Sequence, residues 1–187
     1  ICADPSHLYR RQALREQALQ YAKSGEIARA VAALREIATY PPTDDTIQQV
    51  LDRLFAHCRN SSDAPALATI LPELASLPLT SLNLSKLGLT NLAMITGLSL
   101  TSLECSSNYL TSIASVRAMP LQQLYCGENC LTHLHPLQGM ALHSLRCHDN
   151  QLTDLAPLAG MPLTSLSCWA NAISDLTPLQ GIPLREL

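Results

Sequence analysis

Apolar residues recur along the second half of the chain with a fixed period of 21 residues. From residue 79 onward each period begins with a leucine, and these leucines are Leu79, Leu100, Leu121, Leu142, Leu163 and Leu184. Five successive units share the frame LxxLxCxxNxLTxLxPLxGMP, and a last unit stops after four residues at Leu187. Self-similarity at a period of about 20 to 50 residues indicates a solenoid or another repeat array, because one such unit cannot bury its apolar face alone.

The start of each unit alternates apolar and polar residues, which predicts a half-buried β-strand. Positions four and six of the unit face the core, and positions three, five and seven face outward. The Asn at position nine ends the strand, where its short side chain can bond the turning backbone. The Pro that follows (Pro136, Pro157 and Pro178) cannot continue a long helix, so the return segments are expected to be short 3-10 or extended pieces.

These units fall within the range of about 20 to 29 residues of the leucine-rich repeat, with Cys where Leu is usual at position six. Stacked units predict an α/β solenoid with a parallel sheet on its concave face and 3-10 or extended segments on its convex face. We place this array at residues 71–187, because LPELASLP at 71–78 matches the back half of a unit. The first unit is atypical, with Leu84 for Cys and Leu87 for Asn, as expected of a terminal repeat.

Residues 1–70 have a helical pattern and are predicted to form an N-terminal α-helical domain that caps the array. Apolar residues follow helical spacing over residues 7–40, with a break at Ser24-Gly25 and a stop at Pro41-Pro42. A third helix is expected from Asp44 or Asp45 to about Cys58, and a fourth after residues 60–63. An independent peptide-binding module is the alternative to a capping bundle.

Charge and hydropathy narrow the choice of partners. The net charge is −3 and the pI about 6.0, which argues against a nucleic acid or an acidic membrane as the partner. No apolar run approaches the roughly 18 residues of a membrane span, so no membrane insertion is expected. Because the chain starts at Ile1 and stops within a unit, we expect it to continue covalently into further repeats or domains.

Four of the seven cysteines share position six, and these are Cys105, Cys126, Cys147 and Cys168. Adjacent parallel strands lie about 4.8 Å apart, so distance alone does not exclude a disulfide. Side chains stacked in one column point the same way, however, which makes disulfide geometry poor. Reduced core cysteines are therefore expected, and they favour a reducing compartment and a cytoplasmic location.

The outward positions of the units vary, whereas the inward columns do not. Tyr125, Arg146 and Trp169 fall among them, and Tyr, Trp and Arg are enriched at binding hot spots. The predicted partner-binding residues are Glu104, Tyr125, Glu128, Arg146, His148, Asp149 and Trp169. Surface positions that drift without a ligand are the alternative interpretation.

Histidines and cysteines also cluster between residues 126 and 148, which raises the possibility of a zinc site. The repeat frame disperses them: Cys126 and Cys147 face the core, His148 lies on the strand face, and His133 and His135 lie on the return segment. No metal site, cofactor or catalytic residue is therefore expected, and the chain is not expected to be an enzyme.

The segment GMPLTSL, with Cys in the strand and SDLTPL after it, resembles bacterial leucine-rich repeats. NAISDLTPL at 171–179 resembles the internalin type, and the GMPLTSLxC junction resembles arrays of planctomycete proteins. The spacing of Tyr21, Gly25, Ala30 and Pro42 resembles one tetratricopeptide unit. The resemblance implies a protein–protein recognition or scaffold module of a larger bacterial signalling protein, binding through the concave sheet face. The alternative is a secreted or cell-surface adhesion domain of internalin type.

Overall fold

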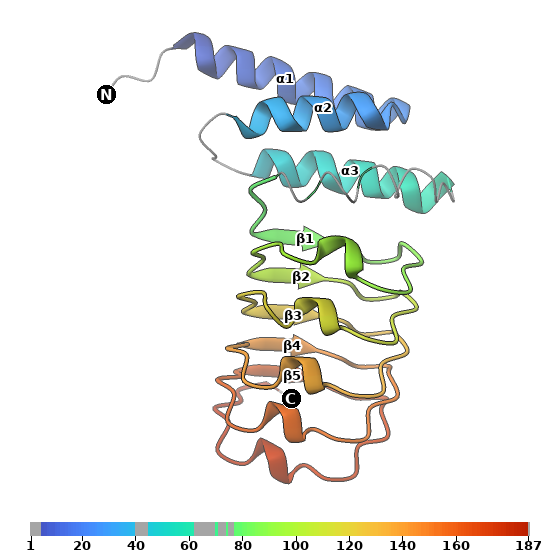
Figure 1. Cartoon of the computed structure of the whole chain (residues 1–187), viewed down its shortest axis with the longest axis vertical. Helices are drawn as coiled ribbons and strands as arrows, with labels where there is room; N and C mark the ends of the chain where they lie inside the picture. The colour runs from blue at the N-terminus through green and yellow to red at the C-terminus, as the bar shows by residue number, and fades with distance from the viewer. Residues whose placement is uncertain (1–4, 40–44, 62–69, 71–73, 75–76, 187) are drawn as a thin grey trace. The chain divides into compact units, whose positions relative to one another are not determined.

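The chain forms two compact units, Ile1–Pro78 and Leu79–Leu187. The structure, a computed structural model, describes residues 5–39, 45–61, 70, 74 and 77–186. Helices make up the first unit and repeats the second (Figure 1).

The helical unit contains α1 (Pro5–Ser24), α2 (Ile27–Ala38) and α3 (Asp45–Ser61). The predicted break falls at Gly25, whose φ is +75° and whose Cβ, if it had one, would lie 2.8 Å from His57 Nε2. Glycine is favoured there, because L side chains rarely adopt this conformation and a Cβ would also displace the His57 ring. The first three predicted helices are confirmed, whereas the fourth falls almost entirely outside the described residues, as does most of the segment 71–78.

Helix α1 packs against both α2 and α3. Ala18, Ala22 and Ala30 are buried at these contacts, and such small side chains let the helix backbones approach closely. Leu34 and Phe55 are fully buried and supply the bulk of the core beside them. That this unit caps the repeats, and that the domain boundary lies at residue 70, both stay predictions.

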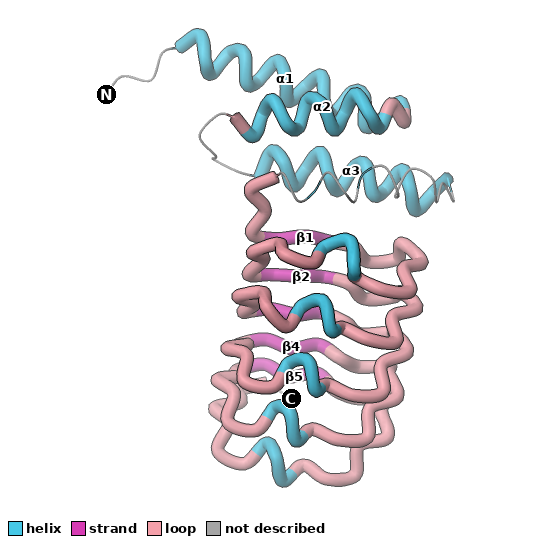
Figure 2. The backbone as a smooth tube through the Cα atoms, in the orientation of Figure 1, coloured by secondary structure: helices cyan, strands magenta, loops and turns pink. Residues whose placement is uncertain are grey.

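The repeat unit contains five three-residue strands: β1 (Ser81–Asn83), β2 (Ser102–Glu104), β3 (Gln123–Tyr125), β4 (Ser144–Arg146) and β5 (Ser165–Ser167). They form one parallel sheet in chain order, in which each residue pairs with the residue 21 positions later, as Leu124 does with Leu145. The sequence period therefore is the sheet register. Figure 2 shows the strands stacked on one side of the repeats and the short helices on the other.

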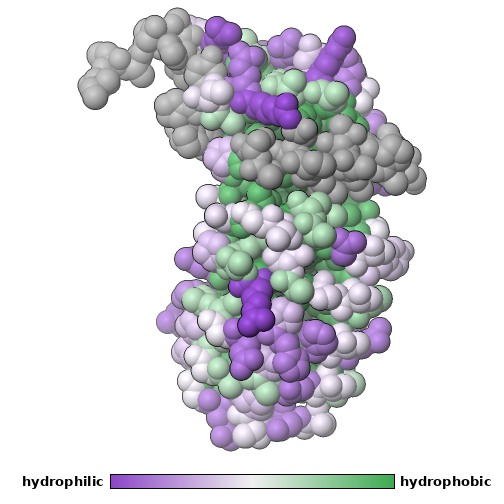
Figure 3. Space-filling model, in the orientation of Figure 1, coloured by the Kyte–Doolittle hydropathy of each residue, from purple (hydrophilic) through white to green (hydrophobic). Residues whose placement is uncertain are grey.

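The return segments are single 3-10 turns, as the proline positions predicted. They are η2 (Ala93–Ile95), η3 (Ala114–Val116), η4 (His135–Leu137), η5 (Ala156–Leu158) and η6 (Thr177–Leu179). The last three begin with proline in their first two positions, where a missing N–H costs no hydrogen bond. In Figure 3, the face of the repeats that carries these turns mixes hydrophilic and apolar residues.

The inward columns form the core of the repeat unit. Position four is buried in every strand, and at position six Leu84, Cys105, Cys126 and Cys147 are also buried. Each fully buried Leu contributes about 1.5–3 kcal/mol relative to an exposed one, so the stacked column is the main source of cohesion between repeats. The predicted leucine-rich-repeat solenoid with N-terminal helices is thus confirmed.

Candidate ligand-binding face

The outward surface of β1–β5 is called the sheet face below. It carries positions three, five and seven of each repeat, which alternate with the inward leucines and cysteines of positions four and six. Because the strands are in register, the position-five residues form one row across the sheet, and they are Asn83, Glu104, Tyr125, Arg146 and Ser167. The predicted outward orientation of this row is confirmed.

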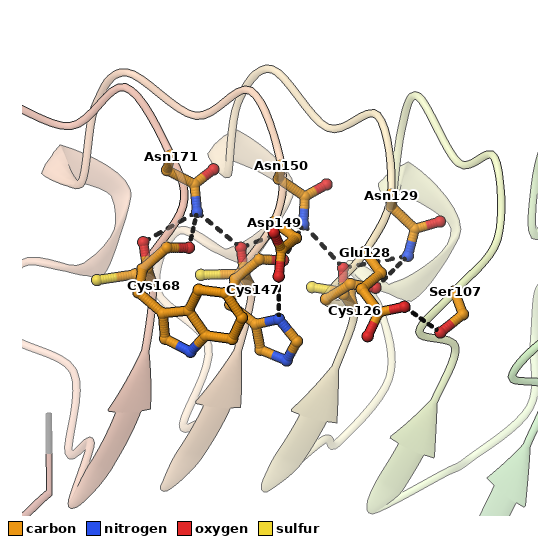
Figure 4. Close-up of polar contacts among 12 residues, drawn as sticks. Ser107, Cys126, Glu128, Asn129, Cys147, Asp149, Asn150, Cys168 and Asn171 are labelled. Carbon is orange, nitrogen blue, oxygen red and sulfur yellow. Dashed lines mark hydrogen bonds and ion pairs between the residues drawn. The ribbon is translucent and has the colours of Figure 1, made fainter.

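A ladder of asparagine side chains holds the edge of this face in place. Asn129 Nδ2 donates to the carbonyls of Cys105, Cys126 and Gly127, and its Oδ1 accepts from the Leu110 N–H. Asn108, Asn150 and Asn171 repeat this pattern one repeat apart, and the last three asparagines of the ladder form a row in Figure 4. The expectation that Asn bonds the turning backbone is confirmed, and each Asn also ties its repeat to the preceding one.

Position eight, just before this Asn, has a left-handed backbone in all five repeats. The residues are Lys86, Ser107, Glu128, Asp149 and Ala170, with φ between 49° and 58°. Such a conformation costs about 1–3 kcal/mol for a residue with a side chain. In the first four repeats the position-eight N–H donates to the position-seven carbonyl of the next repeat, as in Glu128 N–H to His148 O at 2.9 Å. The repeat frame does not predict this strain, because no glycine marks the position.

Tyr125 and Arg146 are paired neighbours on β3 and β4. The Arg146 guanidinium carbon lies 4.9 Å from the centroid of the Tyr125 ring, within the range of a cation–π contact. This stacking restrains the long arginine side chain while leaving it exposed. The pair therefore presents a positive charge in a defined position.

His148 and Trp169 form a second pair one strand further along. Their rings are parallel, with centroids 4.6 Å apart, as in an offset stack. Gly127 makes this geometry possible, because a Cβ there would lie 2.6 Å from His148 Cε1. Trp169 is nevertheless 61% exposed, so a large apolar surface faces solvent, as the sequence predicted.

The predicted acidic residues have intramolecular partners. Glu104 accepts from the Ser106 N–H, Glu128 accepts from the Ser107 hydroxyl (Figure 4), and Asp149 Oδ2 lies 3.1 Å from His148 Nδ1. The seven predicted site residues lie at positions five, seven and eight of neighbouring repeats. Whether they contact a partner stays a prediction.

A shallow hollow of about 400 Å³ lies between these side chains at β4 and β5. Its lining includes Arg146, His148 and Trp169, together with Ser165, Ser167 and Glu186. The last three were not among the predicted site residues. Ser165 and Ser167 are small, and they leave a hollow only because larger side chains lie beside them. Finding the hollow therefore required the register of the strands.

Three of the described cysteines lie beneath this face. The Cys105, Cys126 and Cys147 thiols are fully buried, and burial raises the pKa of each well above its ordinary value. Cys168 was expected to be a core residue like the others, but it follows the last strand, β5, and is only half-buried; burial raises its pKa as well. A thiol that stays protonated is a poor nucleophile and a poor metal ligand.

The described residues form no cluster that could bind a metal ion. Within these ranges, no three His, Cys, Asp or Glu side chains are placed to hold a metal ion, and His133 and His135 only meet edge to face at 5.4 Å. The six cysteines in the described ranges are free. No described helix is long and apolar enough to cross a membrane.

Comparison with known proteins places this architecture. No protein-family model matches the sequence, and no curated protein matches it. Among solved structures, the crystal structure of an internalin (inlF) from Listeria monocytogenes is similar, with 28% sequence identity and a TM-score of 0.58. The similarity covers 63% of this chain and 36% of the internalin, so this chain spans little more than a third of it. The repeat unit therefore has an internalin-like leucine-rich-repeat fold.

Proposed function

We propose that the chain is a protein-recognition module of a larger bacterial protein and that it binds its ligand through the sheet face. The observation that supports this most is the pairing of Tyr125 with Arg146 beside that of His148 with Trp169. Aromatic and arginine side chains dominate binding energies when a partner excludes water from them. Stacking has already restricted their rotamers, so little side-chain entropy is lost when a partner binds.

Binding accounts for these features better than catalysis does. The face is open and shallow, its carboxylates have intramolecular partners, and the buried thiols are protonated. A general acid, base or nucleophile needs an accessible group within hydrogen-bonding reach of a substrate.

The similarity to an internalin favours the second of the two settings considered from the sequence, a secreted or cell-surface ligand-binding domain. The cytoplasmic setting gains no support from it. The cysteine column does not require a reducing compartment, because burial protects Cys105, Cys126 and Cys147 from oxidants in any compartment.

The experiment compares the full chain with a variant of its sheet face. Binders are selected from a displayed library of random 12-residue peptides, and affinities are then measured by fluorescence anisotropy. The variant Tyr125→Ala/Arg146→Ala/Trp169→Ala should bind the selected peptides at least about 100-fold more weakly, since each such anchor contributes about 2 kcal/mol.

The matched control carries three alanines on the side of the 3-10 turns, at the exposed residues Arg117, His135 and Gln138. It should bind like the wild type. Equal loss in both variants, or no loss in the sheet-face variant, would show that the ligand binds elsewhere.

A further inference from the structure

Arg146 has no acidic partner among the described residues. Its guanidinium group stacks on the Tyr125 ring, and no described carboxylate lies within ion-pair distance of it. The nearby acidic side chains have other partners: Glu186 accepts a hydrogen bond from the Ser165 hydroxyl, and Asp149 contacts His148. A restrained arginine with free donors is suited to two parallel hydrogen bonds with a planar carboxylate.

An apolar surface borders the same hollow. Arg146 and Trp169 both line it, and the serines of β5 leave space beside them. Arg146 pairs with Ser167, and Trp169 follows Ser167 by two residues. With typical strand spacing and rise, the Arg146 and Trp169 backbones lie about 8 Å apart. Side chains two residues apart on one side of an extended peptide are separated by about 6–7 Å, so such a peptide can reach both.

We infer that the hollow between β4 and β5 binds an extended peptide segment with the pattern acidic–any–apolar. The Asp or Glu carboxylate pairs with Arg146, and the large apolar side chain two residues away packs on Trp169. This inference rests on the proposed function, and it specifies the chemistry of the ligand.

The charges around the hollow favour a carboxylate over a phosphate. A phosphate carries nearly two negative charges, and both Glu186 and Asp149 lie close enough to the hollow to repel it. A single carboxylate neutralises Arg146 without adding a second charge.

The test uses synthetic peptides and the full chain. Acetylated, amidated and fluorescein-labelled decapeptides carry Glu, Asp, Gln, Lys or phosphoserine at one position and Phe, Leu, Ala or Ser two positions later. Affinities are measured by anisotropy up to millimolar protein. Peptides with Glu or Asp followed by Phe or Leu should bind best, and Glu-to-Gln replacement should weaken binding at least about tenfold.

Variants of the protein then identify the carboxylate's partner. The Arg146→Gln variant should bind Glu peptides at least about tenfold more weakly than the wild type does, and it should bind Glu and Gln peptides equally well. Arg146→Glu should prefer the Lys peptides, which a structural defect would not produce. The control Arg117→Gln, an equally conservative change at an exposed arginine beside η3, should behave like the wild type.

The remaining outcomes separate this inference from the proposed function. If binding depends on Trp169 but not on the peptide's charge, or if phosphoserine binds more tightly than Glu, the carboxylate inference is wrong while the recognition face stands. If none of the synthetic decapeptides binds, the inference also fails. The proposed function fails only if the library-selected binders are insensitive to the triple sheet-face variant.

Discussion

Replacing Asn129 by alanine should destabilise the repeat unit by about 2–4 kcal/mol. The side chain is 8% exposed and makes four hydrogen bonds of 3.0–3.1 Å. The Cys105 carbonyl would keep its bond from the Asn108 amide, the Cys126 carbonyl its bond from the Asn150 amide, and the Gly127 carbonyl its bond from the Ser107 N–H. The Leu110 N–H would lose its acceptor, Asn129 Oδ1, and a buried unsatisfied donor costs about 1–3 kcal/mol. Loss of the three hydrogen bonds from Asn129 Nδ2 adds about 1 kcal/mol to the cost.

Two further variants show whether this reasoning is correct. Asn129→Asp should cost more than alanine, because a carboxylate can still accept from the Leu110 N–H but would face three carbonyl oxygens in a buried place. Asn171→Ala, at the half-exposed end of the ladder, should cost about 1 kcal/mol or less, since water can reach the vacated groups.

The assay is urea unfolding followed by the fluorescence of Trp169. It is the only tryptophan in the sequence, and it lies in the repeat unit, so its signal reports on this unit. Stabilities come from linear extrapolation at an unchanged slope. A loss below about 0.5 kcal/mol for Asn129→Ala, or equal losses for Asn129→Ala and Asn171→Ala, would refute the role assigned to the ladder.

Three further predictions follow from single contacts. Gly127→Ala should displace the His148 ring and alter Trp169 fluorescence, at a stability cost below about 1.5 kcal/mol. The control Ser106→Ala, at the same position of the preceding repeat, should leave the fluorescence unchanged. Iodoacetamide labelling mapped by mass spectrometry should modify Cys168 well before Cys105, Cys126 and Cys147, and equal native rates would contradict the burial order. Hydrogen bonds from Thr177 hold the pKa of Asp175 below its ordinary value of 3.8. Because the folded pKa is the lower one, this contribution to stability is present above the unfolded pKa and is lost as the pH falls through the folded pKa. The stability difference between wild type and Asp175→Asn, which keeps an acceptor but does not titrate, should therefore shrink on acidification; a constant difference would argue against it.

Much of the candidate face could be derived from the repeat frame. Alternation within LxxLxC assigned Tyr125 and Arg146 outward and Cys126 and Cys147 inward, because a strand turns successive side chains to opposite sides. The register needed no further information, since a period of 21 with parallel stacking brings each position beside its equivalent. Trp169 was likewise assigned to the surface, where it is 61% exposed.

Other features of the face depend on lateral neighbours that the frame does not specify. The pattern places His148 outward, but only the missing side chain of Gly127 allows its ring to stack on Trp169. Cys168 has the same place in its repeat as Cys147, yet its burial differs, because burial depends on what packs against a residue.

The sequence by itself determined the repeat period, the inward and outward residues and the proline-started 3-10 turns, because these follow from local spacing and backbone chemistry. The tertiary structure alone decided the hydrogen bonds of each Asn across 24 residues, the left-handed backbone at Glu128 and Asp149, and the hollow beside Arg146. These features require atoms from adjacent repeats, and the distances between such atoms exist only once the repeats have stacked.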